Sequence, residues 1–142
     1  MPMDIWVEPD RQLRRAVARD TLTDRDLLEA WGDVLADPAF DPDCDNLVDM
    51  SGVERFEVTP LGAQRLADVM AMCAKPPAAG VRPRVAFVAP DDRAFGILRM
   101  YEMYRELQGA AQRFFVTRSL EEARCWLALP RVEAAEARQP AS

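Results

Sequence analysis

The sequence contains no histidine, and this absence excludes several kinds of functional site. Without imidazole the chain has no Ser-His-Asp triad, no HExxH metal site and no haem or zinc ligation through histidine. Cysteine is also scarce, because only Cys44, Cys73 and Cys125 occur, far apart and without a CxxC pair. This pattern favours neither a disulfide framework nor a cysteine-rich metal centre. We expect no metal or other cofactor, a reducing cytoplasmic location, and burial of Cys73 and Cys125 as small apolar residues.

Excess positive charge and long apolar runs are missing as well. The net charge is −6, so we expect no nucleic-acid partner, because the acidic chain repels a polyanion on average. The longest unbroken apolar run is Val69–Ala74, far short of the roughly 18–20 residues that a membrane span needs. The first residues have neither the basic start nor the apolar core of a signal peptide. The sequence therefore predicts a cytoplasmic protein with no membrane span.

The remaining composition is that of an ordinary globular protein. Hydrophobic residues make up 49% of the chain and charged residues 30%, which argues against extensive disorder. A chain of 142 residues is the usual length of one domain. We expect one domain over residues 1–129. The tail over residues 130–142 has almost no large apolar residue and is expected to be flexible or marginally helical.

Five strands are predicted from short β-like runs. Ile5–Val7 and Leu13–Arg19 flank a Pro-Asp turn and predict an antiparallel hairpin. Further strands are expected at Leu47–Met50, Val85–Ala89 and Arg113–Thr117. Val85–Ala89 is apolar at every position, which is typical of a strand covered on both faces.

Four helices are predicted where apolar residues recur at helical spacing after a capping residue. The capping residues are Thr23, Thr59, Asp91 or Asp92, and Ser119. Ser119 and Glu122 match a capping box, and Thr23 with Asp26 nearly matches one. The element order is then ββαβαβαβα. Alternating strands and helices predict an α/β fold with a mostly parallel sheet of about five strands and an antiparallel edge hairpin.

Two stretches of sequence resemble a known family. Leu47–Val53, Leu-Val-Asp-Met-Ser-Gly-Val, is similar to a strand-and-turn segment that commonly reads Asp-Leu-Ser-Gly-Val. Phe95–Glu102 is similar to a helix of the SpoIIAA-like branch. With the element order, these stretches make residues 3–129 resemble the STAS domains, the family of anti-sigma factor antagonists. The resemblance implies a SpoIIAA-like fold and a non-enzymatic regulatory domain that binds a protein partner.

The resemblance also bears on phosphorylation. Family members that switch sigma factors carry a phosphorylatable serine in an Asp-Ser-Ser-Gly-like turn before the second helix. The corresponding turn here is Glu57-Val58-Thr59-Pro60. Glu57 matches the acidic position, but Val58 stands where the phosphoacceptor would be. The chain therefore lacks the usual phosphoacceptor serine, and only Thr59 beside it carries a hydroxyl.

The carboxyl ends of the strands are one predicted binding region. In open α/β sheets ligands bind beyond these ends, so Ser51, Glu57, Thr59 and the loop after Ala89 are expected to converge there. The start of the second helix offers unpaired N–H groups to an anion. The alternatives are structural: Thr59 serves only as a helix cap, and Ser51-Gly52 only as a tight turn.

The acidic segment Asp41, Asp43 and Asp45 begins like a calcium-binding loop. The pattern then departs, because Asn46 replaces the expected glycine and Gly52 stands where a bidentate glutamate is needed. A solvated acidic loop is the favoured interpretation.

The third helix, residues 93–108, is more apolar than a surface helix requires. Its polar residues Arg99, Glu102 and Glu106 form one narrow stripe, and apolar residues cover nearly all the rest. Several of its side chains are candidates for contact with a partner protein, a second copy of the chain or an apolar ligand: Phe95, Arg99, Met100, Met103 and Tyr104. The alternative is a helix pressed between the sheet and a neighbouring helix. Gly96 is expected to permit a close approach of another backbone or a ligand.

Three functional hypotheses follow. The first is a protein-interaction domain, which includes self-association as a homodimer. The second is a small-molecule or lipid-binding module, with an apolar pocket bordered by the third helix and the connector Lys75–Pro83. The third, an enzyme that uses carboxylates and arginine, is disfavoured because no acidic residues stand in a recognisable catalytic frame.

Overall fold

We describe a computed structural model of the chain, which covers residues 2–130. The predicted tail, apart from its first residue, lies outside the described residues. The elements in chain order are β1 (Met3–Glu8), β2 (Leu13–Thr23), α1 (Asp24–Ala36), β3 (Asp45–Glu57), α2 (Pro60–Cys73), β4 (Arg84–Val88), α3 (Asp92–Leu107), β5 (Arg113–Thr117) and α4 (Leu120–Ala128). A single 3₁₀ turn, Pro9–Arg11, joins β1 to β2. The order ββαβαβαβα is the predicted one.

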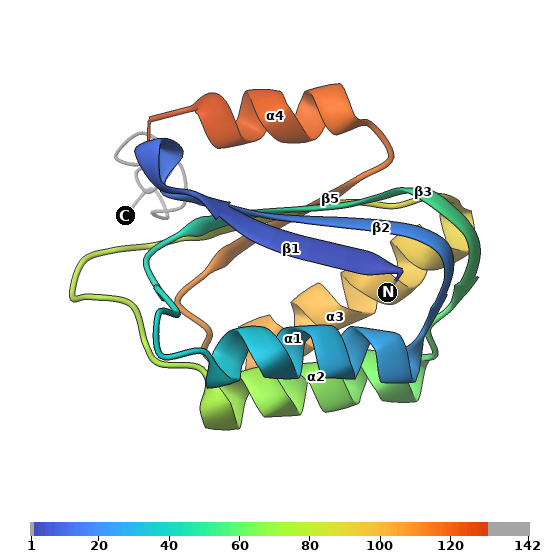
Figure 1. Cartoon of the computed structure of the whole chain (residues 1–142), viewed down its shortest axis with the longest axis horizontal. Coiled ribbons are helices and arrows are strands. Elements are labelled where there is room, and N and C mark those ends of the chain that lie inside the picture. The colour runs from blue at the N-terminus through green and yellow to red at the C-terminus, as the bar shows by residue number, and fades with distance from the viewer. Residues whose placement is uncertain (1, 131–142) are drawn as a thin grey trace.

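The five strands form one mixed sheet in the order β1-β2-β3-β4-β5. β1 pairs antiparallel with β2, and all the other neighbouring pairs are parallel. Each parallel connection passes through a helix, as parallel pairing requires. Helices α1, α2 and α3 cover one face of the sheet and α4 covers the other (Figure 1). The predicted α/β fold with an antiparallel edge hairpin is confirmed, and β4 is an interior strand.

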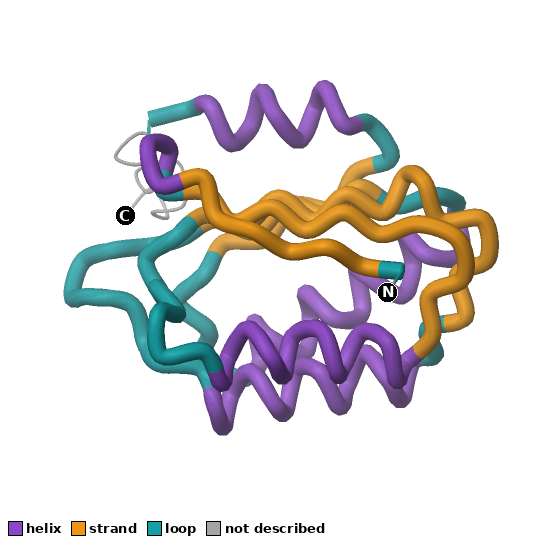
Figure 2. Tube along the Cα trace, viewed as in Figure 1, coloured by secondary structure: helices purple, strands orange, loops and turns teal. Residues whose placement is uncertain are grey.

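The helices and the sheet form three layers (Figure 2), and two apolar cores lie between them. The larger core lies between the sheet and α1–α3, and it contains Val48 and Phe87. The smaller core lies under α4 and contains Leu47, Val88 and Ala123. Successive residues of a strand point to opposite faces, so β3 and β4 are apolar at consecutive positions because both faces are covered. No helix within residues 2–130 has the length and apolar character that crossing a membrane demands.

β3 is much longer than predicted, and the turn expected at Ser51-Gly52 is wrong. The strand continues to Glu57 because β2 pairs with it over almost its whole length, out to Thr23 opposite Glu57. Register shifts near Val17 and Asp20 allow β2 and β3 to bend together while they stay paired. Asp20 takes a left-handed φ of 59°. Backbone pairing with a long neighbour thus overrides the local turn signal.

The helix caps lie at the predicted residues, but the two predicted capping boxes differ: the one at Thr23 is complete and the one at Ser119 is not. Thr23 and Asp26 form a full reciprocal capping box, since each backbone N–H bonds to the other's side chain. Ser119 accepts from the Glu122 N–H at 3.2 Å, but the box is not closed. The Glu122 carboxylate instead accepts from the Thr117 hydroxyl at 2.6 Å.

Two packing predictions are wrong. Cys73 and Cys125 are exposed and only Cys44 is buried. Cys73 ends α2, whose buried stripe is Gly62, Ala63, Leu66 and Ala67, and α4 buries only Ala123. Gly96 is exposed and no other segment of the described chain lies within 4 Å of a Cβ added there, so the approach of another backbone or a ligand stays a prediction.

Candidate functional site

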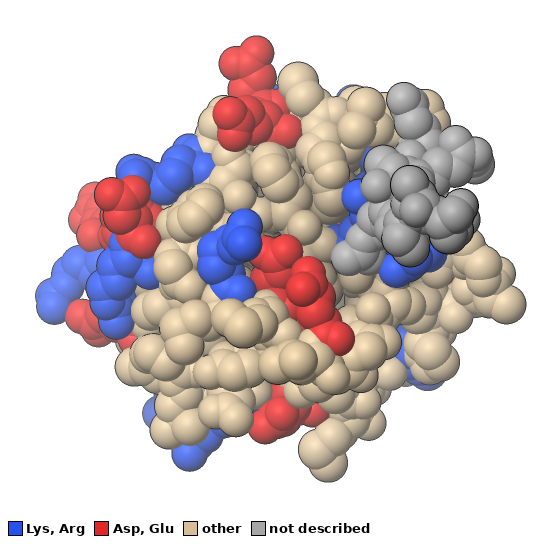
Figure 3. All heavy atoms as spheres, turned by 180° about the vertical axis from the view of Figure 1, so that it is seen from behind, with Lys and Arg blue, Asp and Glu red and all other residues tan. Residues whose placement is uncertain are grey.

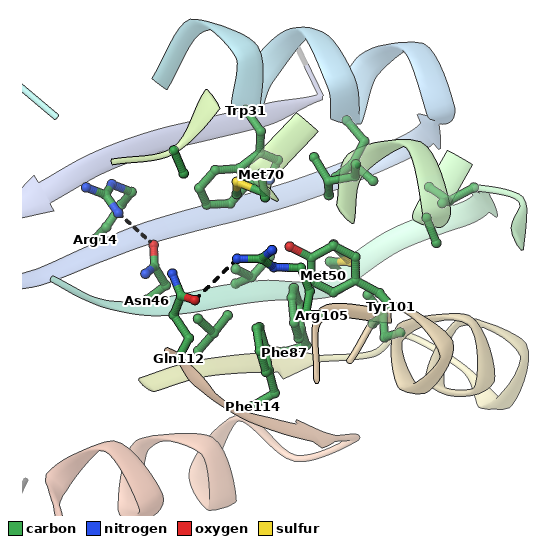
Figure 4. Close-up of a pocket in the computed structure, with 18 of the residues that line it drawn as sticks. Arg14, Trp31, Asn46, Met50, Met70, Phe87, Tyr101, Arg105, Gln112 and Phe114 are labelled. Carbon is green, nitrogen blue, oxygen red and sulfur yellow. Dashed lines mark hydrogen bonds between the residues drawn. The ribbon is translucent and has the colours of Figure 1, made fainter. Parts of the chain in front are cut away.

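A cavity of about 60 Å³ lies between the sheet and helices α1, α2 and α3 (Figure 4). Its walls are mainly large apolar side chains from all three helices and from the sheet, among them Trp31, Met50, Leu66, Phe87 and Tyr101. The local sequence explains this lining. Met50 is one of the β3 side chains that point to the helix face, and Tyr101 projects from the buried stripe of α3. An apolar pocket bordered by the third helix is therefore present.

The connector Lys75–Pro83 does not line this pocket, contrary to the expectation from the sequence. Phe40 and Pro42 of the acidic loop stand there instead, together with Ala74 at the end of α2.

One end of the pocket is polar. Arg14 of β2 donates to the Asn46 side-chain oxygen of β3 at 3.0 Å. Arg105 of α3 donates to the side-chain oxygen of Gln112, just before β5, at 3.3 Å. Figure 4 draws both pairs in the same pocket. Arg14, Asn46 and Gln112 all stand at the amino ends of parallel strands, which is the opposite edge of the sheet from the predicted binding region.

Arg14 is held by several groups and is only 4% exposed. A second nitrogen donates to the Asp41 backbone oxygen at 2.9 Å, and the guanidinium lies 4.7 Å from the centre of the Phe40 ring. Burial lowers the pKa of Arg14, while the nearby Cys44 and Asp41 groups act in the opposite direction. Arg14 therefore has one acidic residue close to it.

Arg105 is 6% exposed and its side-chain partners are all neutral. It donates to Gln108 at 2.9 Å and to Gln112, and it stands near enough to the Tyr101 phenol to act on its pKa. Burial raises the pKa of Tyr101 to about 12, partly opposed by Arg105, so the phenol stays uncharged at neutral pH. Within residues 2–130 no carboxylate forms an ion pair with Arg105.

The lack of a carboxylate at Arg105 is energetically significant. Burying a charge carries an effective penalty of several kcal/mol, which a counter-charge normally offsets. Arg105 lies in the last turn of α3, where the helix dipole favours a cation, but that effect is worth only about 0.3–1 kcal/mol. The dipole and two neutral hydrogen-bond partners leave the charge of Arg105 incompletely balanced.

Arg84 is a buried arginine with a structural role, and its partners differ from those of Arg105. It is 3% exposed and pairs with Asp45 at 2.9 Å. Its guanidinium also donates to three carbonyls at the end of α4, those of Trp126, Leu127 and Leu129. Arg84 thus joins β3, β4 and α4, and it has the carboxylate that Arg105 lacks.

The acidic loop is solvated only in part: Asp41 and Asp43 are half-buried, and the interpretation is wrong for Asp45. Asp45 is buried in its pair with Arg84, and Asp43 accepts from the Ala78 N–H at 2.8 Å. Asp41 accepts from the Asp43 N–H, and this bond is the main cause that lowers the pKa of Asp41. No group of three or more acidic or cysteine residues within the described chain is arranged to hold a metal ion.

At the predicted edge, an internal carboxylate occupies the start of α2. Thr59 caps the helix by accepting from the Gly62 N–H at 3.0 Å. Its own N–H and hydroxyl donate to the two carboxylate oxygens of Asp24, at 2.8 and 2.6 Å. Asp24 therefore supplies the negative charge that an external anion would bring to this helix end.

Only some of the other residues predicted at that edge lie close together. Arg93 at the start of α3 donates to the backbone oxygens of Phe56 and Val58, so the loop after β4 does approach the Thr59 segment. Ser51 lies inside β3 and donates to Asp49, and no hydrogen bond within the described chain links it to Thr59. Glu57 is exposed and pairs with Arg55 at 2.9 Å.

The α3 candidates lie away from the pocket. Arg99 is exposed and pairs with Glu102 at 3.5 Å, and Met103 is exposed. Phe95 and Tyr104 are half-buried against the larger core, and Met100 is half-buried. The α3 residues that line the pocket are instead Ile97, Leu98, Tyr101 and Arg105.

Sequence reasoning missed Arg14, Asn46, Arg105 and Gln112. One signal was available for Arg105, because it follows Ile97 and Tyr101 at intervals of four residues and so shares their apolar stripe. A charged residue on a buried helix face marks a position that needs explanation.

The comparisons with known proteins concern the fold. No protein-family model matches the sequence, and no curated protein matches it. Among solved structures, the chain is similar to an uncharacterized protein of the DUF3478 family from Shewanella loihica PV-4, described as having a SpoIIAA-like fold. The two share 14% sequence identity with a TM-score of 0.53, over 89% of this chain and 94% of that one. The chain therefore has a SpoIIAA-like fold, as its resemblance to the STAS domains implied.

Proposed function

We propose that this chain is a non-enzymatic binding domain, which holds a small and mostly apolar ligand in the pocket between the sheet and α1–α3. The observation that carries the proposal is the cavity, since protein interiors are otherwise close-packed and contain few voids larger than a water molecule. Apolar walls with a few convergent polar groups are typical of ligand sites. The ionisable groups of the pocket are Tyr101 and two arginines, and none of them is a base or nucleophile at neutral pH.

The volume sets the size of the ligand. A cavity of 60 Å³ offers about four to six positions for a water-sized group. Pockets for drug-sized ligands are larger, at about 300–1,000 Å³. A cavity that holds benzene has about 150 Å³, so an aromatic ring and a long-chain lipid are both too large, and the ligand that fits is a short acyl chain of about four to six non-hydrogen atoms.

The test is binding of small neutral probes, 1-propanol and 1-butanol, followed by NMR titration of the full chain. We expect saturable shifts in the signals of pocket residues such as Trp31 and Leu66. Ala63→Leu fills the cavity from α2 and should abolish binding, whereas Ala71→Leu adds the same atoms on the exposed side of α2 and should not. Absence of saturable shifts in the wild-type chain, or equal binding by both variants, would reject the proposal.

A second candidate function is protein contact through the outer faces of α2 and α3, including self-association. Large apolar side chains are exposed there: Met72 (84%), Met103 (55%) and Leu107 (81%). The bond between Asp68 of α2 and Gln108 after α3 ties the two helices together near these residues. In the rear view of the molecule, uncharged residues cover much of the lower half (Figure 3).

This second function matches the regulatory role that the STAS resemblance implies, without a kinase-operated switch. Val58 is buried and carries no hydroxyl, and the Thr59 hydroxyl is occupied by Asp24. Light scattering over a concentration series tests self-association. We expect the mass to rise toward that of a dimer and the rise to be lost in Leu107→Lys. A concentration-independent monomer would exclude the homodimer.

A further inference from the structure

The polar end of the pocket holds more positive than negative charge. Two buried guanidiniums, those of Arg14 and Arg105, line it, and Asp41 is the acidic residue that acts on Arg14. Both arginines donate within the pocket to side-chain amides, Asn46 and Gln112, which are the neutral analogues of aspartate and glutamate. Each arginine thus meets a neutral amide oxygen at a position where a carboxylate would supply a counter-charge.

Of the two arginines, Arg105 has the hydrogen-bond partners that a ligand can displace more easily. Its bond to Gln112 is long, at 3.3 Å, and Gln112 is a half-buried residue between the end of α3 and β5. Its bond to Gln108 reaches toward the exposed end of α3. An incoming acceptor can therefore replace the Gln112 oxygen without breaking a strand or a helix.

We propose that the ligand of this pocket is a small organic carboxylate, bound through Arg105 with Arg14 adjacent, while its apolar group fills the cavity. This inference rests on the ligand-binding function proposed above. A carboxylate matches the planar fork of a guanidinium and supplies the charge that the site lacks. A single negative charge suffices, because Asp41 already acts on Arg14.

The size of the cavity and the position of the arginines narrow the ligand further. The two arginines are the charged residues of the lining, and most of the other lining side chains are apolar, so the carboxylate must be terminal to a compact apolar group. Propionate and butyrate meet this description. 1-Propanol and 1-butanol are their neutral counterparts of nearly the same shape.

The experiment compares the dissociation constants of each acid and its matched alcohol by calorimetry at pH 7, in a buffer free of carboxylates. Hydrogen bonds to charged groups are worth enough to expect the acid to bind about tenfold to a hundredfold more tightly than the alcohol. Arg105→Gln should reduce this preference to about one. Arg65→Gln removes an equal charge from the exposed side of α2 and should leave the preference unchanged.

Gln112→Glu is the second variant, and it does not depend on removing the arginine. The new carboxylate should pair with Arg105 itself, which raises the thermal midpoint and removes the preference for the acid. If Arg105→Gln does not fold, Gln112→Glu by itself tests whether Arg105 binds the carboxylate. Retention of the acid preference in Gln112→Glu, or its loss in Arg65→Gln, would overturn the inference.

The two proposals fail in different ways. If the wild-type chain binds the alcohols saturably but prefers the acids by less than about twofold, the carboxylate inference is wrong and ligand binding stands. If neither acids nor alcohols bind, both proposals are wrong.

Discussion

Replacing Arg84 with methionine should destabilise the protein strongly, because it breaks a buried ion pair and uncaps a helix. The side chain makes four hydrogen bonds, one to Asp45 and three to backbone carbonyls at the end of α4. Removing one partner of a buried pair leaves the other charge uncompensated, at about 3–5 kcal/mol. A domain of this size is stable by only about 5–15 kcal/mol, so Arg84→Met removes a large part of the total.

The assay is urea unfolding followed by circular dichroism. With an ordinary urea m-value near 2 kcal/mol/M, we expect the midpoint to fall by about 1.5–2.5 M. Hydrogen exchange gives a local measure. In Arg84→Met the exchange rates of α4 amides should rise more than those of α3 amides. Arg25→Met is the matched control, because the pair Arg25–Glu29 lies on the surface of α1 and should leave the midpoint nearly unchanged.

The refuting result is a midpoint for Arg84→Met that shifts no further than that of Arg25→Met. A double variant, Arg84→Met with Asp45→Leu, adds a second check. Replacing both members of a buried pair with apolar groups often recovers stability. The double variant should therefore unfold at a higher urea concentration than Arg84→Met alone.

Three further predictions concern α2 and the core. Gly62→Ala should destabilise by about 1–3 kcal/mol in urea unfolding, since the new Cβ meets the Asp24 carboxylate; Gly32→Ala in α1, where the Cβ meets open space, should be neutral or stabilising. Thr59→Ala removes both the cap of α2 and a donor to Asp24, so a loss of about 1–2 kcal/mol is expected, and a change below about 0.3 kcal/mol would contradict it. The pKa of Tyr101 is raised from 10.0 to about 12, so its neutral form stabilises the fold below pH 10 and this contribution is lost as the pH rises from 10 to 12. Ultraviolet titration should show one of the two tyrosines ionising late, and a Tyr101→Phe variant should lose that late step.

Parts of the fold were predictable because their causes are local. Proline and the capping residues Thr23, Thr59 and Asp91 fixed where helices begin, since each side chain bonds to backbone within its own turn. The run Arg113–Thr117 was found with the observed bounds. The apolar run at 85–89 was found within one residue. The sequence of elements and the parallel sheet follow from these local features.

The length of β3 was not predictable in the same way. Ser51 and Gly52 are ordinary turn residues, but β2 runs alongside them and pairs with β3 both before and after them. Similarly, Thr59 was correctly predicted as a cap, while the carboxylate of Asp24 beside it, 35 residues away in sequence, was not. Such contacts depend on how distant segments are placed.

The sequence alone determined the order of strands and helices, the helix caps and the apolar segments, because these depend on residues within a few positions of one another. Only the tertiary structure decided where the pocket of the proposed ligand lies. The pairing of β2 with β3 sets Arg14 beside Asn46, and the turn after α3 sets Gln112 beside Arg105. These contacts form at the amino edge of the sheet, opposite the edge that strand and helix patterns favoured, because no local pattern records which buried charges meet across the core.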